Sequence, residues 1–388
     1  MTDKPQFVGQ KVKLSDICSI VSGATPKTTV KDYWGGDIKW ITPSELNDDS
    51  HVIYNTAKHL TEAGFASARL RMFPEGTVLL TTRAPIGKVA IAGEPMCCNQ
   101  GFKNLVCSDA VNNEYLYRYL KNRSSELQVL GRGATFKELS KKEVAAYEIN
   151  LPPLKRQLEA VEKLALVDKQ VVIAKTQLDK LDSLVKSRFI EMFGDPVEEN
   201  RWARITLASL CTKLGSGATP RGGKAAYKTS GIPLIRSMNV HNGYFESKDL
   251  AYIDEIQAKK LDNVTLHKGD VLLNITGASV ARSCLLPDYL AGGRVNQHVS
   301  IVRCDPNRML PRVLNSIFTS DSYQRFLLEH SRMAGATREA ITKDDLETMT
   351  VPLPPLSLQY KFAAFVAQVD KSRFVAQQQI EKLQMLYD

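Results

Sequence analysis

The most regular hydrophobic pattern in the chain lies between residues 157 and 193, a stretch without glycine or proline. Apolar residues recur there at alternating spacings of three and four, which is typical of a coiled-coil seam. At 1.5 Å per residue the stretch predicts a helix of roughly 55 Å, ended by Gly194 and Pro196. The seam positions are Leu164, Val167, Val171, Ala174, Leu178, Leu181, Val185, Arg188 and Met192.

The same seam returns near the end of the chain, over residues 359–388. It predicts a second helix of roughly 45 Å. Its positions are Val366, Val369, Arg373, Ala376, Ile380, Leu383 and Tyr387. A long helix with one apolar seam needs a partner in water, and each of these helices is the other's nearest candidate.

Outside these two stretches, short runs alternate between polar and apolar residues or are rich in β-branched residues, and they predict strands. We expect strands at 37–42, 77–82, 88–92, 104–107, 232–235, 271–275 and 299–302. Short helices are expected at 113–122 and 312–318. The pattern therefore predicts an α+β protein with two globular heads and two long helices.

The chain is a tandem duplication, because ordered strings recur at a nearly constant offset. Ser22-Gly-Ala-Thr-Pro returns 194 residues later, and Leu151-Pro-Pro-Leu returns 202 residues later. We divide the chain into a first head (1–156), a first long helix (157–193), a linker (194–200), a second head (201–358) and a second long helix (359–388).

Two helices related by a two-fold axis within one chain run antiparallel, so we expect an antiparallel coiled coil that separates the heads. The alternative is that each helix packs on its own head. Some apolar residues fall outside the seam at matching positions, Val172-Ile173 with Phe374-Val375 and Leu184 with Leu386. Either the heads or two copies of another protein cover these side chains.

Charge and cysteine content narrow the class of protein. The net charge is +9, and the excess is shared, with 27 Lys+Arg against 22 Asp+Glu in residues 1–194 and 24 against 20 in the rest. The seven cysteines have no zinc-ligand spacing. No run is long and apolar enough to span a bilayer, and residues 1–6 lack a signal peptide's apolar core. We expect a cytoplasmic protein without a metal.

No catalytic motif is convincing. Gly222-Gly-Lys-Ala departs from the P-loop pattern, and Leu151-Pro-Pro-Leu lacks the polar and aromatic ends of the methyltransferase motif. Basic residues near glycine-rich turns instead predict contacts with double-stranded DNA. The candidates are Lys27, Arg83, Lys88, Arg132, Lys137, Arg221, Arg236, Arg282, Arg332 and Arg338. For any one of them, the alternative is an ordinary solvated charge.

The order of head, Leu-Pro-Pro-Leu turn and long helix, given twice with Gly-Ala-Thr-Pro openings, resembles the specificity subunit of Type I restriction-modification systems. Residues 34–42, Arg83 to Val89 and Asn99-Gln100 add to the likeness, which covers essentially the whole chain. The second head departs from it, with Gly231 to Arg236 where the first has Trp40 to Thr42.

The resemblance implies that each head is a target recognition domain for half of a bipartite DNA sequence. It implies that the helices bind two DNA methyltransferase (modification) subunits, which carry S-adenosylmethionine. ATP-dependent restriction subunits, using ATP with Mg²⁺, are further implied partners. The chain itself is then non-catalytic and holds no cofactor. The competing hypotheses are a stand-alone DNA-modifying enzyme, and a DNA-binding regulator or coiled-coil scaffold.

Overall fold

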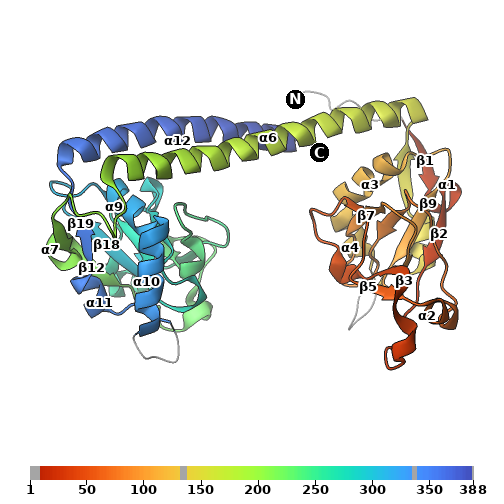
Figure 1. Cartoon of the computed structure of the whole chain (residues 1–388), viewed down its shortest axis with the longest axis horizontal. Helices are drawn as coiled ribbons and strands as arrows, with labels where there is room; N and C mark the ends of the chain where they lie inside the picture. The colour runs from red at the N-terminus through yellow and green to blue at the C-terminus, as the bar shows by residue number, and fades with distance from the viewer. Residues whose placement is uncertain (1–8, 132–137, 334–338, 387–388) are drawn as a thin grey trace. The chain divides into compact units, whose positions relative to one another are not determined.

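A computed structural model describes residues 9–131, 138–333 and 339–386. The chain forms two compact units (Figure 1). The N-terminal unit contains the chain up to Ile173 together with the segment from Gln379 onwards, and the C-terminal unit contains Ala174–Gln378. The prediction of a duplicated α+β protein with two long helices is confirmed, because the units repeat the same sheets and each takes part of both helices.

Both units are built on the same three groups of strands. In the N-terminal unit these are a pair, a five-stranded sheet in the order β2-β9-β6-β7-β4, and a three-stranded sheet in the order β5-β3-β8. The strands are β1 (Gln10–Lys13) with β10 (Glu148–Leu151), β2 (Cys18–Ser22), β9 (Lys103–Cys107), β6 (Val78–Leu80), β7 (Val89–Ala92), β4 (Val52–Ile53), β5 (Lys58–Leu60), β3 (Trp34–Ile41) and β8 (Cys97–Cys98).

The C-terminal unit repeats this plan with a pair, a sheet β12-β18-β15-β16 and a sheet β14-β13-β17. The strands are β11 (Arg204–Thr206) with β19 (Thr350–Pro352), β12 (Cys211–Ser216), β18 (Val299–Cys304), β15 (Val271–Asn274), β16 (Ser283–Leu285), β14 (Ala251–Ile253), β13 (Ile232–Ile235) and β17 (Arg294–Val295). In both units the short last strand of the smaller sheet is parallel to its neighbour, β3 with β8 and β13 with β17.

Short helices cover the sheets. They are α1 (Leu14–Ile17), α2 (Glu62–Ser67), α3 (Asn113–Asn122), α4 (Ser124–Leu130) and α5 (Lys141–Ala146) in the first unit, and α7 (Leu207–Leu210), α8 (Glu255–Lys260), α9 (Pro311–Phe318), α10 (Asp321–Met333) and α11 (Lys343–Thr348) in the second. Helix α3 buries Leu116 and Leu120 in one core with Val78 and Leu80 of the larger sheet. The amphipathic pattern of this helix follows from that contact.

The long helices begin three residues earlier than predicted. Helix α6 spans Leu154–Phe193 and α12 spans Leu356–Gln384. Each starts directly after the second proline of its Leu-Pro-Pro-Leu turn, and the carbonyl of Pro153 accepts from the amides of Arg156 and Gln157. Proline lacks an amide hydrogen, so it fits just before the first helical turn. At the other end of α6, Gly194 has a left-handed backbone (φ 76°) that ends the helix.

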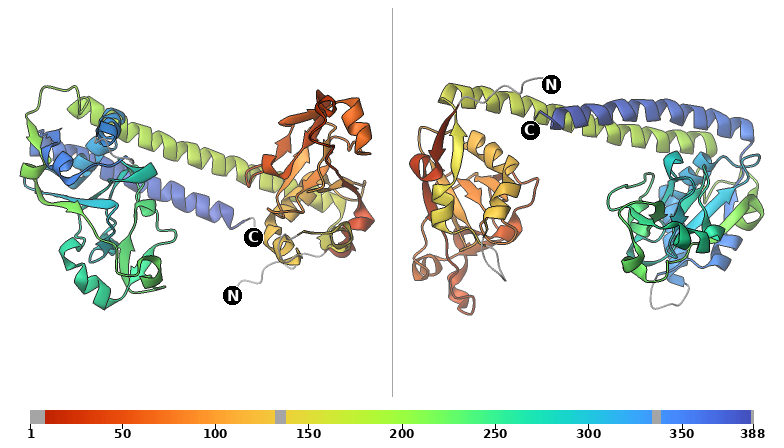
Figure 2. Two further views of the ribbon diagram at one scale, coloured as in Figure 1. Left: turned by 90° about the horizontal axis from the view of Figure 1, so that it is seen from below. Right: turned by 180° about the vertical axis from the view of Figure 1, so that it is seen from behind.

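The long helices pair antiparallel in the C-terminal unit (Figures 1 and 2). The ring of Phe362, near the start of α12, lies 5.6 Å from that of Phe189 and 5.5 Å from that of Phe193, near the end of α6. Further along, Arg373 forms an ion pair with Asp182. Every described seam residue is buried or half-buried, so the predicted seam is confirmed. Tyr387 lies outside the described residues.

The heads cover part of the off-seam apolar surface. Phe189 and Phe193 enter the core of the C-terminal unit. Val172 is 62% exposed and Phe374 is 63% exposed, and Ile173, Val375, Leu184 and Leu386 are also exposed. A head therefore covers the aromatic end of α6, whereas the paired positions Val172-Ile173, Phe374-Val375, Leu184 and Leu386 are exposed, and their coverage by another protein stays a prediction.

Candidate nucleic-acid interface

The Gly-Ala-Thr-Pro motif leads the chain across the end of the smaller sheet in each unit. A Cβ added at Gly23 would lie 1.8 Å from the carbonyl oxygen of Cys98, and one at Gly217 would lie 1.9 Å from that of Val295. Only glycine permits so close an approach of two backbones. The following residue then donates its amide to the same carbonyl, Ala24 to Cys98 at 3.1 Å and Ala218 to Val295 at 3.2 Å.

An Asn-Gln turn follows at the same place in both units. The side-chain oxygen of Asn99 accepts from the amide of Gly101 at 2.9 Å, and that of Asn296 accepts from the amide of His298 at 3.1 Å. Asparagine thus fixes the turn, and the next residue, Gln100 or Gln297, is exposed. Because the two turns share one geometry, differences between their surroundings come from side chains.

In the N-terminal unit this turn borders a small cleft of about 450 Å³. Thr25 of the Gly-Ala-Thr-Pro motif donates to Gln100 at 2.5 Å. This bond joins two segments that lie 75 residues apart in the sequence. The cleft is lined by Thr42, Ser44, Lys58, Arg83, Asn99 and Gln100, among others.

Glu45, the acidic residue that lines this cleft, forms hydrogen bonds with backbone amides. Glu45 accepts from the amides of Thr42 and Ala57, both at 2.7 Å. Arg83 is exposed and forms an ion pair with Glu138, with Nε 3.0 Å from Oε2. Lys103 lies 3.7 Å from the other oxygen of the same carboxylate. Burial lowers the pKa of the Lys103 amine, and Glu138 opposes that shift.

The corresponding cluster in the C-terminal unit is built around His298. Thr276 Oγ1 lies 2.6 Å from His298 Nδ1, and Gln297 Nε2 lies 3.3 Å from His298 Nε2. The neighbouring Gly277 donates its amide to the carbonyl of Glu339, whose carboxylate pairs with Arg332 at 3.0 Å. Hydroxyl, amide and imidazole groups thus occupy the turn where the other unit presents a guanidinium.

The predicted basic residues fall into two groups. Lys27, Arg83, Arg221 and Arg332 are exposed, and Lys88, Arg236 and Arg282 are half-buried. The Lys88 amine donates to the carbonyl of Leu46 at 3.0 Å, and Arg236 donates to the carbonyl of Asp249 while lying over Tyr227. These two side chains therefore hold loops of their own heads. Arg132, Lys137 and Arg338 lie outside the described residues.

Lys103 and Glu138 are functional candidates that sequence patterns did not predict. Both belong to the charged group around Arg83, although 55 residues separate Arg83 from Glu138. Comparing the two copies of the repeat could have identified these residues. Arg83, Lys103 and Glu138 align with Thr276, Ser300 and Ala340, so three charges differ together between the copies.

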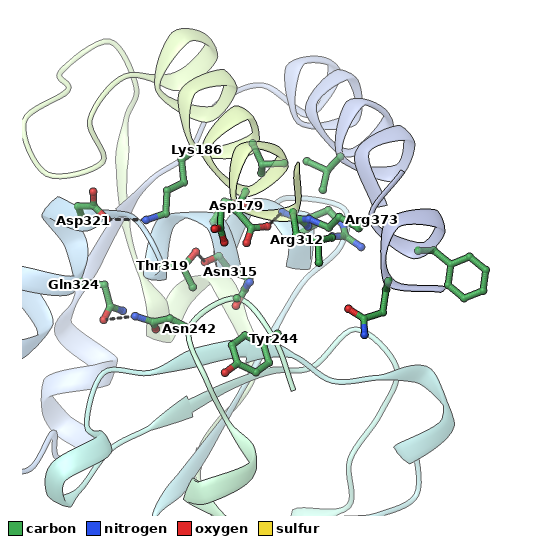
Figure 3. Close-up of a pocket in the computed structure, with 18 of the residues that line it drawn as sticks. Asp179, Lys186, Asn242, Tyr244, Arg312, Asn315, Thr319, Asp321, Gln324 and Arg373 are labelled. Atoms are coloured by element: carbon green, nitrogen blue, oxygen red, sulfur yellow. Dashed lines mark hydrogen bonds and ion pairs between the residues drawn. The ribbon is translucent and has the colours of Figure 1, made fainter. Parts of the chain in front are cut away.

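A second concave surface lies wholly in the C-terminal unit, between the paired long helices and the head (Figure 3). It encloses about 1280 Å³. Lys186 of α6 pairs with Asp321 at 2.9 Å, and Asn242 donates to Gln324 at 3.0 Å on the opposite side. The exposed Phe374 also lines it. Charged, amide and aromatic side chains line this groove.

Within the described residues, no group of three or more His, Cys, Asp or Glu side chains could hold a metal ion. The seven cysteines are free thiols. The described helices include none with the length and apolarity needed to cross a membrane.

Comparison with known proteins identifies the class. A family model described as the Type I restriction modification DNA specificity domain matches residues 9–183 and again residues 199–385. The chain belongs to this family, and it contains two copies of the family's domain.

The similarity extends to whole proteins. The chain is 30% identical over 400 residues to the Type I restriction enzyme MjaIX specificity subunit of Methanocaldococcus jannaschii, covering 97% of this chain and 90% of the relative. It is 20% identical over 335 residues to the EcoKI specificity subunit of Escherichia coli, covering 77% of this chain and 68% of that one.

Solved structures support the fold. A chain from a structure described as the basis of "complex assembly and conformational transition of the type I R-M system" matches with a TM-score of 0.61 at 18% identity, covering 98% of this chain and 96% of that one. The S subunit of a Type I system from M. genitalium matches with a TM-score of 0.53 at 12% identity, covering 100% and 96%.

Proposed function

We propose that this chain is the DNA-recognition subunit of a Type I restriction-modification complex, and that each unit reads one half of a bipartite target. The observation that carries this proposal is the pair of equivalent turns, Asn99–Gly101 and Asn296–His298, which share a backbone geometry and differ in the side chains around them. One fold used twice with different polar groups suits the reading of two different short sequences.

We also propose that the chain performs no chemistry of its own. Its membership of a family described as a DNA specificity domain favours this view. S-adenosylmethionine, and ATP with Mg²⁺, would then be bound by modification and restriction subunits. The groove beside α6 and α12, which the exposed Phe374 lines, is where we expect a modification subunit to bind. That the paired helices separate the two heads stays a prediction of the sequence.

The test is selection of bound DNA from a randomised duplex library, with the purified chain alone and with its modification subunits. We expect two short conserved blocks with an unread spacer, bound more tightly when the partner is present. The variant Arg83→Ala should weaken binding, while Arg156→Ala, which removes an exposed arginine of α6, should not. Selection of no sequence by either preparation would contradict the proposal.

Two further measurements separate the competing hypotheses. A stand-alone modifying enzyme would transfer a methyl group from S-adenosylmethionine to the selected DNA without any partner. A regulator would bind its site with the same affinity in the presence and absence of modification subunits.

A further inference from the structure

Arg83 in the first head and Thr276 in the second occupy the same position, by backbone geometry as well as by sequence alignment. Arg83 forms an isolated antiparallel bridge with Glu138, and Thr276 forms the same bridge with Ala340. One residue earlier, the amide of Thr82 donates to Gly101, and the amide of Ile275 donates to His298. The surrounding backbone is therefore the same, so the side chains at this position can be compared directly.

In the first head this position carries two cations and one anion. Glu138 lies between Arg83 and Lys103, at 3.0 Å and 3.7 Å from their nitrogen atoms. The Lys103 side chain is 9% exposed, whereas that of Arg83 is 48% exposed. The carboxylate is thus shared with a buried amine, and it holds Arg83 through Nε at the rim of the cleft. This contact orients the guanidinium and leaves part of its fork at the surface.

In the second head all three charges are absent. Strand β2 pairs with β9 as β12 pairs with β18, so Ser22 opposite Lys103 corresponds to Ser216 opposite Ser300. Ser300 is buried, and its hydroxyl has no hydrogen-bond partner among the described residues. His298, in the place of Gly101, fills the space beside Thr276. All three charged positions are replaced together, by Thr276, Ser300 and Ala340, so none of these three positions keeps a charge whose partner is lost.

Both versions lie beside an exposed glutamine at the same turn, Gln100 or Gln297. Glutamine and arginine are side chains that read base edges in the major groove, and a guanidinium fork matches the two acceptors, O6 and N7, of guanine. A threonine–histidine–glutamine cluster lacks two parallel N–H donors on one planar group, and its glutamine amide pairs a donor with an acceptor, which suits adenine rather than guanine.

We propose that this position is a base-discriminating subsite in each head: Arg83, oriented by Glu138, reads a guanine in the first half-site, and Thr276 with His298 and Gln297 reads a different base in the second. The inference rests on the proposed function, because it requires that the heads bind DNA. It goes further by naming the residues that make the two heads read different bases.

The first experiment compares Arg83→Lys with wild type by binding to the selected duplex and to versions with each base of the first half-site replaced. Lysine keeps the charge but loses the fork. We expect the guanine preference at one base pair to fall by about 10–100-fold, the range of a bidentate contact. Preferences in the second half-site and the salt dependence should stay unchanged, since the charge remains.

The second experiment transfers the neutral group into the first head with Arg83→Thr, Lys103→Ser and Glu138→Ala together, checked for folding by thermal unfolding. Its guanine preference should fall as in Arg83→Lys. The variant His298→Gly should alter base preference in the second half-site alone. If the triple variant does not fold, Arg83→Lys and His298→Gly still decide the matter.

Three outcomes would overturn the inference. Arg83→Lys could bind every sequence as wild type does. The triple variant could weaken binding to all sequences equally with a smaller salt dependence, which is the behaviour of a phosphate contact. His298→Gly could leave the second half-site unchanged. By contrast, a wild-type chain that selects no sequence contradicts the proposed function itself, so the two failures are distinguishable.

Discussion

Each long helix forms three hydrogen bonds with its own head and the turn before it through one buried glutamine, and replacing that glutamine should weaken the contact between helix and head. Gln157 accepts from the amide of Asn112 at 2.8 Å and donates to the carbonyls of Ala110 and Pro152 at 3.0 and 2.8 Å. Gln359 repeats all three bonds in the other unit, including a 2.8 Å bond from the amide of Leu310. Both side chains are fully buried.

The variant Gln157→Ala removes the hydrogen-bond partner of the Asn112 amide and of the carbonyls of Ala110 and Pro152. Each hydrogen bond contributes about 0.5–1.5 kcal/mol net, so we expect a loss of about 3 kcal/mol. For a unit of this size that loss lowers Tm by about 6–12 °C. Gln157→Glu keeps the acceptor but directs a carboxylate at two carbonyls, so at pH 7 it should destabilise the unit more than alanine does. Acidification should narrow the difference as the carboxyl gains a proton.

Hydrogen exchange measures the local stability around each glutamine separately, whereas one melting curve reports on both units together. Gln157→Ala should speed exchange of the Asn112 amide and leave that of Leu310 unchanged, and Gln359→Ala should do the reverse. The matched control is Gln170→Ala, at an exposed position of α6. The reasoning is refuted if both amides keep wild-type protection, or if either variant deprotects both.

Three further predictions concern the helices and the core. Ile380→Asp places a carboxylate at a buried seam position and should lower the free energy of unfolding by about 2–4 kcal/mol in chemical denaturation, whereas Gln379→Asp, at an exposed position, should change it by less than about 0.5 kcal/mol. Phe374→Ser should leave stability within about 0.5 kcal/mol but weaken binding of the modification subunit at least tenfold by calorimetry, and unchanged binding would place the partner elsewhere. Burial raises the pKa of the Cys284 thiol from 9.0 to about 12, so the thiol ionises at a lower pH in the unfolded chain than in the folded one. Its contribution to the free energy of unfolding is therefore retained below pH 9 and lost between pH 9 and 12. The variant Cys284→Ala should reduce that loss, measured by urea unfolding at pH 8 and at pH 10.5. A pH dependence identical to that of wild type would show that this thiol does not contribute.

The candidate site was only partly predictable. Lys27 and Arg83 were expected from their glycine-rich turns, and both are exposed. The sequence could not show that Lys88 donates to the carbonyl of Leu46, 42 residues earlier, because a basic residue near glycine looks the same whether it faces solvent or holds a loop. The sharing of Glu138 by Arg83 and Lys103 was equally hidden, since strand pairing alone brings these residues together.

The sequence by itself determined what depends on local periodicity and on the repeat. Seam spacing predicted which residues of α6 and α12 are buried, alternation predicted strands such as β13 at its observed bounds, and the constant offset predicted two copies of one fold. Tertiary structure decided which residues distant in the chain are in contact. It brings Gln157 to the amide of Asn112, and it places Glu138 beside both Arg83 and Lys103. It also decides that a head covers Phe189 while Phe374 stays exposed. The physical reason is that a helix or strand is specified by neighbours a few residues apart, whereas these contacts depend on how whole elements pack.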